Sequence, residues 1–352
     1  MTQSLPDSKA SSTQPLLLLC IGWAILSLLF FLLFGALVPG EESRPNWFLI
    51  SITFIEIFGF LLATVLCFRN FGSSQIISGR TVWLSLGIAM LAYAAGNVFF
   101  FLWGTVWGLD PSVSLGDGFY FISYVCMVVG MLLAALPRRI DLSVSQWMMI
   151  LAIGVGGVLL ALAINFGLPG LAQVPGINRP AVAADMLTSQ APPPDPATAP
   201  EAAPEAPTAA PAEETAETAA PEEPPTAVEE AETVAGLMPA PVWAQTLDAN
   251  LEKYAEPVGL MYVIADCFLV VIAATLLVAF WGGRFSQSWK LIAIATFCLY
   301  LADIAFAAAG DNYVEGALWE VFWVWSSLFF ALGAIVEYDV SKRSRRGSRR
   351  RA

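Results

Sequence analysis

Four polar side chains occur inside strongly apolar stretches of the sequence, where they could do chemistry at membrane depth. Glu56, Asp266 and Asp303 are acids, and Asn97 is an amide. An ionisable side chain in a membrane costs at least ~2.5 kcal/mol on the most lenient scale, so it usually faces the protein interior and has a partner. One interpretation is a protonatable polar site between two halves of a bundle. The alternative is that neutral acids hydrogen-bond neighbouring helices and only stabilise packing.

Two further acids stand where helices are expected to begin. Asp117 ends the sequence Ser114-Leu-Gly-Asp117, a capping-box pattern in which the carboxylate binds exposed backbone N–H groups and favours the helix dipole. Glu320 takes the same place in a later helix, but no Ser stands three residues before it. The sequence therefore predicts less secure capping by Glu320.

Aromatic residues gather around both of these helix starts. They could stack on a flat lipophilic ligand such as a quinone, a carotenoid or a chlorophyll. The alternative is that they anchor the helices at the membrane interface and fill the core. The candidate residues are Trp103, Trp107, Phe119, Tyr120, Trp319, Phe322 and Trp323.

The composition excludes most familiar membrane chemistry. Histidine is absent, which excludes haem or metal ligation through His as well as Ser-His-Asp and Cys-His catalysis. All five cysteines fall in predicted helices, where we interpret them as small reduced residues. A retinal Schiff base is not expected, and neither is a metal site. With no nucleotide-binding motif either, we expect a non-enzymatic protein that binds no nucleic acid.

The elements that must position these residues are membrane helices. The chain is 57% hydrophobic, and its apolar runs of about 20 residues match the length that crosses a ~30 Å hydrocarbon layer. The sequence predicts an all-α integral membrane protein with eight spans. The expected spans are residues 15–38, 47–68, 81–104, 115–136, 144–167, 258–281, 288–309 and 317–337.

Basic residues concentrate in alternate loops and in the C-terminal tail. Residues 342–352 hold seven bases and no acid, whereas 168–257 hold fifteen acids and two bases. By the positive-inside rule, residues 1–14 and 338–352 are cytoplasmic tails and the acidic segment lies on the opposite side. The basic tail is expected to contact anionic lipids. We expect a prokaryotic inner or internal membrane.

The sequence repeats itself across one helix pair. Tyr93 to Leu133 is echoed by Tyr300 to Val336, and from Asp117 and Glu320 onward the two copies align without a gap. Together with the acids Glu56 and Asp266, this predicts two parallel four-helix halves, residues 15–136 and residues 144–167 with 258–337.

An acidic, Pro- and Ala-rich insertion, 168–257, separates the first two helices of the second half. Its residues 175–241 contain too little apolar surface to offset the entropy of ordering and are expected to be disordered. Apolar residues at helical spacing over 242–256 predict an amphipathic helix on the membrane surface or against the bundle. A plain extension of the next span is the alternative.

Residues 81–136 resemble a known family. The run Y-A-A-G-N, then D-P-S-V-S-L-G-D-G-F-Y-F-I-S-Y and G-M-L-L, is similar to the internally repeated multi-helix membrane sensor region ahead of some bacterial histidine kinases and diguanylate cyclases. Residues 288–337 match that pattern more loosely. The resemblance implies the fold of that region, here without its output domain and with an insertion foreign to the pattern.

Two functions remain open from the sequence. The first is a stand-alone, sensor-like or accessory binding module that associates with a larger membrane protein assembly and with a lipophilic ligand. The second is a small-solute or proton-coupled transporter with a midplane acidic site.

Overall fold

The structure is a computed structural model, and it describes residues 13–37, 43–109, 113–135, 143–165, 236–279, 286–309 and 313–349. Every regular element in this described part is helical. The helices are α1 (Gln14–Phe34), α2 (Asn46–Gly72), α3 (Arg80–Phe101) with a π-helical turn at Leu102–Val106, α4 (Leu115–Ala135), α5 (Val144–Asn165), α7 (Val242–Leu251), α8 (Ala255–Ala279), α9 (Ser286–Ala309) and α10 (Val321–Arg349). Short 3₁₀ turns at Glu252–Tyr254 and Leu318–Glu320 precede α8 and α10.

Eight helical stretches of the described chain are long and apolar enough to cross a membrane. The prediction of an all-helical, multi-pass membrane protein is therefore confirmed at that level. The largest difference from the predicted spans is at the end of α10, which continues as a helix to Arg349 instead of ending near residue 337.

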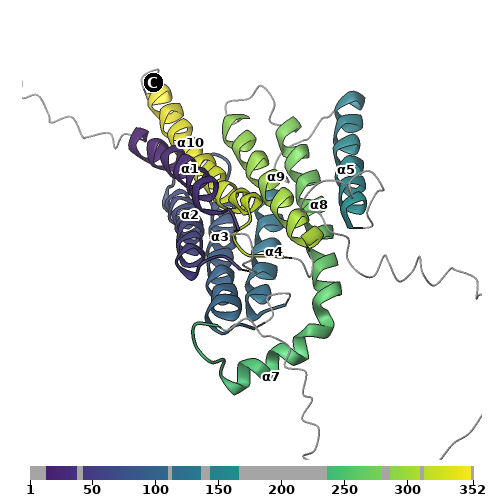
Figure 1. Cartoon of the computed structure of the whole chain (residues 1–352). Coiled ribbons are helices and arrows are strands. Elements are labelled where there is room, and N and C mark those ends of the chain that lie inside the picture. The colour runs from purple at the N-terminus through teal and green to yellow at the C-terminus, as the bar shows by residue number, and fades with distance from the viewer. Residues whose placement is uncertain are drawn as a thin grey trace, which may run out of the picture.

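Two three-helix groups form the centre of the bundle. In one group α3 packs between α2 and α4, and in the other α9 packs between α8 and α10. The groups meet where α2 contacts α10 and where α4 contacts α8. Helix α1 packs mainly against α10, whereas α5 packs against α8 and α9 at the edge of the molecule (Figure 1).

Small residues let the central helices approach closely. A Cβ on Gly130 would lie 3.2 Å from the Leu86 side chain, and one on Gly333 would lie 3.0 Å from Ile292. A Cβ on Gly96 would lie 2.5 Å from the Tyr120 ring. Side chains at these three positions would push the helices apart, so glycine is needed for the α3–α4 and α9–α10 contacts.

The amphipathic segment before α8 folds against one end of the bundle, which we call the α7 end (Figure 1). Trp243 of α7 contacts the rings of Trp103 and Trp107 with centroid distances of 6.4 and 5.6 Å. Trp103 Nε1 donates a hydrogen bond of 2.7 Å to Asp248. These contacts hold α7 against the end of α3, and the 3₁₀ turn joins α7 to α8.

A short strap, residues 236–238, precedes α7 and binds the end of α3. The backbone N–H groups of Leu237 and Met238 donate to the carbonyls of Thr105 and Val106 at 3.3 and 2.8 Å. A π-helical turn ends α3 at this point, and such turns shift the helical hydrogen-bond register. Residues 236–241, which were predicted to be disordered, are therefore ordered, and the rest of that predicted segment, 175–235, lies outside the described residues.

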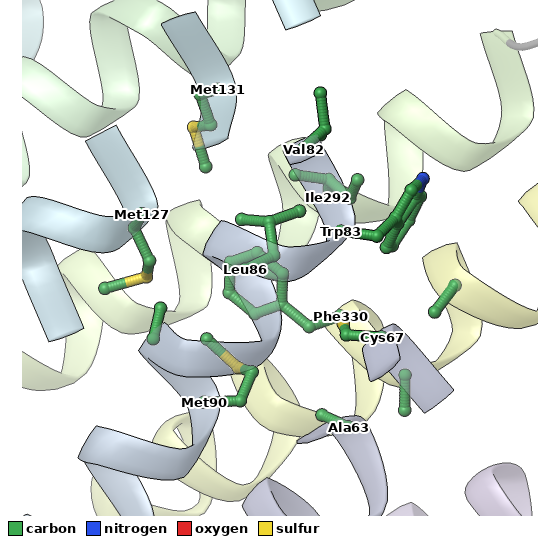
Figure 2. Close-up of a cluster of buried hydrophobic side chains, with 14 of the residues drawn as sticks. Ala63, Cys67, Val82, Trp83, Leu86, Met90, Met127, Met131, Ile292 and Phe330 are labelled. Carbon is green, nitrogen blue, oxygen red and sulfur yellow. The ribbon is translucent and has the colours of Figure 1, made fainter. Parts of the chain in front are cut away.

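An apolar core lies in the half of the bundle away from α7, and buried polar side chains such as Asn70, Ser288 and Glu337 lie at the same end. Figure 2 shows Trp83, Leu86 and Met90 of α3 interleaved with side chains of α4, α9 and α10. All of these α3 residues are completely buried. The labelled neighbours that pack with them are Met127, Met131, Ile292 and Phe330.

Candidate functional site

Two of the predicted acids meet on one tyrosine in the membrane-spanning part of the bundle. The Tyr124 hydroxyl on α4 lies 2.7 Å from Asp266 Oδ1 on α8 and is also within hydrogen-bond distance of Asp303 Oδ2 on α9. Trp323 Nε1 on α10 donates a 2.5 Å hydrogen bond to Asp303 Oδ1. One side chain from each of four helices therefore forms this group, which we call the acid pair site.

The geometry of the acid pair site requires a carboxyl proton. A tyrosine hydroxyl has a single hydrogen, so it can donate to only one of the two carboxyl groups it contacts. The second carboxyl needs a proton to donate to the phenol oxygen or to the other acid, because Asp266 and Asp303 also form a side-chain hydrogen bond with each other. Asp303 already accepts from Trp323, whereas Asp266 is 1% exposed and its Oδ2 has no hydrogen-bond partner in the described chain. One carboxyl proton is therefore shared within the group of Tyr124, Asp266 and Asp303.

The other two predicted polar residues form a neighbouring group in the first half. Glu56 on α2 interacts with the Asn97 side chain on α3, and Asp303 lies close enough to act on the charge of Glu56. Asn97 Oδ1 accepts a 2.8 Å hydrogen bond from Tyr120, while its buried Nδ2 has no hydrogen bond of full geometry in the described residues. The Tyr93 ring lies 4.8 Å from that of Tyr120. All four predicted intramembrane residues thus belong to one connected polar region.

Asp117 and Glu320 act locally as helix caps. Asp117 Oδ2 accepts from the Ser114 backbone N–H at 2.6 Å, and its Oδ1 accepts from the Tyr262 hydroxyl at 2.6 Å. Glu320 Oε1 accepts from the backbone N–H groups of Gly316 and Ala317 at 2.8 and 2.9 Å. The prediction of less secure capping by Glu320 is wrong, because its longer side chain reaches two backbone donors without help from a Ser.

Glu315 and Arg44 lie outside the spans, at the α7 end. Glu315 Oε2 accepts from Thr105 Oγ1 at 3.0 Å, and burial raises the Glu315 pKa to about 7 against the lowering effect of that hydrogen bond. Arg44 donates to the backbone carbonyls of Gly35, Val314 and Glu315 at 2.8 to 3.1 Å. Burial lowers the Arg44 pKa, while the nearby Glu320 and Tyr313 act in the opposite direction. Arg44 therefore joins the loops that follow α1 and α9.

The candidate ligand-stacking aromatics fall into separate groups that are occupied by protein neighbours. Trp103 and Trp107 pack with each other at 5.8 Å and with α7. Trp319 and Trp323 pack at 5.4 Å beside Tyr313 and Phe306. The remaining candidates pair locally, Phe119 with Phe99, Phe322 with Trp325, and Tyr120 with Tyr93. These contacts do not assemble one shared aromatic platform in the described chain.

Sequence reasoning did not identify Tyr124, Tyr262 and Glu315 as site residues. Tyr124 and Tyr262 are tyrosines facing helices that carry acids, and their pattern in the sequence is that of ordinary aromatic membrane residues. The sequence could have pointed to Tyr124, because it follows the candidate Tyr120 by four residues and so lies on the same helix face. No pattern in the sequence points to Glu315, because an acid in a loop is usually exposed to solvent.

The described residues contain no group of three or more His, Cys, Asp or Glu side chains that could hold a metal ion. Comparison of this chain with protein families, with curated proteins and with solved structures finds no match in any of the three.

Proposed function

We propose that the chain is a non-enzymatic, sensor-like membrane module in which the binding event is protonation of the acid pair site. One observation carries this proposal: Tyr124 bonds both Asp266 and Asp303, so the site needs a carboxyl proton to keep its hydrogen bonds. No basic side chain in the described chain is among the groups acting on either acid. A proton is thus the ligand that best matches this arrangement.

Protonation and deprotonation of this site would change how four helices pack. Loss of the proton leaves two carboxylates facing each other across one hydroxyl, and like charges at this distance in an apolar surrounding repel strongly. Because α4, α8, α9 and α10 each contribute one member, relief of that repulsion would move them apart. A charge change that alters the packing of several helices is the usual basis of a pH-responsive switch.

The remaining parts of the proposal concern partners. The module would report its state to other membrane proteins, and the basic residues 342–352 would contact anionic lipids. The proposal keeps a lipophilic ligand such as a quinone, carotenoid or chlorophyll, but only one that binds to aromatic side chains exposed on the outside of the bundle.

The duplication of the two halves also remains a proposal. The Asn97–Tyr120 contact between α3 and α4 has a counterpart in the Asp303–Trp323 contact between α9 and α10, which supports the duplication. Helices α1 and α5 have different neighbours, so the proposed duplication covers only the two three-helix groups.

A proton-coupled transporter is the second candidate. The extra acids Glu56 and Glu315 favour it, because they extend the polar region from the acid pair site toward the α7 end. The apolar core in Figure 2 counts against it, since a through-path would also have to pass this core.

Infrared spectroscopy of the protein in lipid vesicles tests the proposed function. The wild type should show a carbonyl stretch of a protonated carboxyl that disappears on alkalinisation and is missing from Asp266→Asn, whereas the band of Glu315 should remain in that variant. Tyr124→Phe should change the band's frequency or its titration, because the shared hydroxyl is gone. Tyr254→Phe, an exposed tyrosine at the α7 end, is the matched control. If every titrating carboxyl band of the wild type persisted in Asp266→Asn, the proposal would be refuted, and a steady proton flux lost in Asp303→Asn would favour the transporter.

A further inference from the structure

Two basic side chains share one aromatic ring at the end of the bundle away from α7. The guanidinium carbon of Arg69 lies 4.2 Å from the centre of the Tyr338 ring, and the Lys342 ammonium nitrogen lies 4.2 Å from the same centre. Arg69 is in the last turn of α2, and Tyr338 and Lys342 are one turn apart on α10, which ends on the side opposite α7 (Figure 1). The two cations are thus no further apart than twice the distance from either cation to the ring centre.

These two cations have no carboxylate partner among the described residues. The ion pair found beside them joins Arg343 to Asp339 at 2.8 Å, and it includes neither Arg69 nor Lys342. The face of an aromatic ring attracts a cation but carries no net negative charge, and two like charges this close repel each other. The group of Arg69, Tyr338 and Lys342 therefore favours the binding of an anion.

Arg69 is held in place by α10 and still has unused hydrogen-bond donors. Its Nη2 donates to the Ala334 carbonyl at 3.5 Å, and the neighbouring Asn70 Nδ2 donates to the same carbonyl at 2.9 Å. Within the described chain, Nε and Nη1 of Arg69 make no hydrogen bond. A guanidinium carries five N–H donors in a planar fork that matches the oxygens of a phosphate. Arg69 can thus bind a phosphate through Nη1 without giving up its contact with α10.

The group lies at the depth where lipid phosphates occur. The apolar spans predicted for residues 47–68 and 317–337 end immediately before Arg69 and Tyr338. Lipid headgroups lie directly outside the hydrocarbon layer that such spans cross. Arg69, Tyr338 and Lys342 are each partly exposed, so a headgroup has access to them from outside the bundle. Basic pockets between membrane helices are a recurring type of site for anionic headgroups.

We propose that Arg69 and Lys342 bind the phosphate group of one anionic lipid beside Tyr338. This site goes beyond a general contact of residues 342–352 with anionic lipids, because Arg69 and Tyr338 lie outside that segment and Arg343 within it takes no part. The bound lipid joins α2 to α10, where the two three-helix groups meet. The site does not depend on the acid pair site, so its failure would leave the proposed protonation untouched.

Native mass spectrometry of the full chain in mild detergent tests this site. Phosphatidylglycerol is added stepwise, and the dissociation constant of the first bound lipid is measured. The wild type should bind phosphatidylglycerol more tightly than phosphatidylcholine, because the choline cation offsets the phosphate charge. Arg69→Gln and Lys342→Gln should each weaken the binding of the first phosphatidylglycerol about tenfold or more, since each removes a charged donor to the phosphate. Lys342→Arg keeps the charge and should bind as the wild type does.

Arg343→Gln is the matched control. It changes the net charge by the same amount at the next residue, but the Arg343 side chain is 79% exposed and paired with Asp339. It should weaken the binding of the first lipid less than about twofold. An equal loss in Arg343→Gln and Lys342→Gln would overturn the site, because diffuse attraction to the basic segment would then explain the binding.

Two further measurements identify the ligand and separate binding from folding. Inorganic phosphate at millimolar concentration should not displace the lipid. Displacement by inorganic phosphate would overturn the assignment to a lipid, and so would equal affinities of the wild type for phosphatidylglycerol and phosphatidylcholine. Added phosphatidylglycerol should raise the thermal midpoint of the wild type and of Arg343→Gln but not that of Lys342→Gln. If Arg69→Gln is already less stable without lipid, the comparison of Lys342→Gln with Arg343→Gln decides.

Discussion

The carboxyl groups of Asp303, Asp117 and Glu320 accept their hydrogen bonds from neutral donors. Asp303 accepts from an indole, Asp117 from a phenol and a backbone N–H, and Glu320 from two backbone N–H groups. Such donors stabilise a carboxylate without adding a second charge that would itself need compensation in the membrane. The acids can therefore change protonation without breaking an ion pair, as a site that binds and releases protons requires.

Titration of Glu315 should make the folded protein less stable as the pH rises. Burial raises its pKa in the folded chain to about 7 from the ordinary value of 4.5. Between these values the folded chain binds more protons than the unfolded chain, so the free energy of unfolding should fall as the pH rises through this interval. The loss from this group is on the order of 3 kcal/mol at most.

Thermal unfolding in detergent from pH 4.5 to 7.5 measures that contribution. Glu315→Gln should flatten the decline, since its side-chain oxygen still accepts from Thr105 but does not titrate. Glu252→Gln should keep the slope of the wild type. If Glu315→Gln kept that slope too, other acids of the bundle would have to cause the pH dependence.

At the scale of elements, the strap, residues 236–238, packs closely against the π-helical turn at the end of α3. Gly236 has no room for a side chain, because a Cβ there would lie 2.5 Å from the backbone of Trp107 and Gly108. The strap then donates two backbone hydrogen bonds to Thr105 and Val106, and Thr105 in turn holds Glu315. The strap thus supports the loop that carries Glu315.

Gly236→Ala should loosen this contact without unfolding the bundle. The methyl group must displace backbone atoms, so the hydrogen bonds of Leu237 and Met238 weaken and their amide exchange should accelerate roughly tenfold. Gly259→Ala is the control, because a Cβ at Gly259 meets nothing within 4 Å. Unchanged exchange in Gly236→Ala would mean that the strap tolerates the shift.

Much of the element-level architecture could be predicted from the sequence, and the site could be predicted only in part. Apolar length determined the spans, and the cost of a membrane acid identified Glu56, Asp266 and Asp303. The partnership of Asp266 with Asp303 through Tyr124 depends on how α4 packs against α8 and α9, which a pattern along one helix does not specify. The extension of α10 was missed because its polar, basic end resembles a tail as much as a helix.

The orientation of the whole molecule is predicted by its loop charges and can be measured directly. Cysteines placed at Ser73, between α2 and α3, and at Ala249, on the exposed face of α7, should react with a membrane-impermeant maleimide from opposite sides. The five native cysteines all lie within helices, so background labelling should be low. Labelling of both sites from one side would contradict the predicted topology.

The acidic insertion should be dispensable for folding of the whole molecule, provided that the strap is kept. Residues 178–235 lie outside the described residues and are rich in Pro, Ala and Glu, a composition that offers little apolar surface to bury. Loop closure costs only ~0.6 kcal/mol per doubling of length. Replacing 178–235 with a short Gly/Ser segment should therefore leave the thermal midpoint within a few degrees.

The matched variant extends the same replacement to residue 241. This removes the strap, whose N–H groups bind Thr105 and Val106, along with the residues that lead into α7. Each lost hydrogen bond is worth roughly 0.5–1.5 kcal/mol, and the Trp243 contacts weaken as well, so this longer replacement should lower the midpoint measurably. A large loss of stability in the shorter replacement would show that the insertion packs on the bundle. Equal midpoints for both replacements would show that the strap contributes nothing to stability, and the described contacts of residues 236–238 argue against that result.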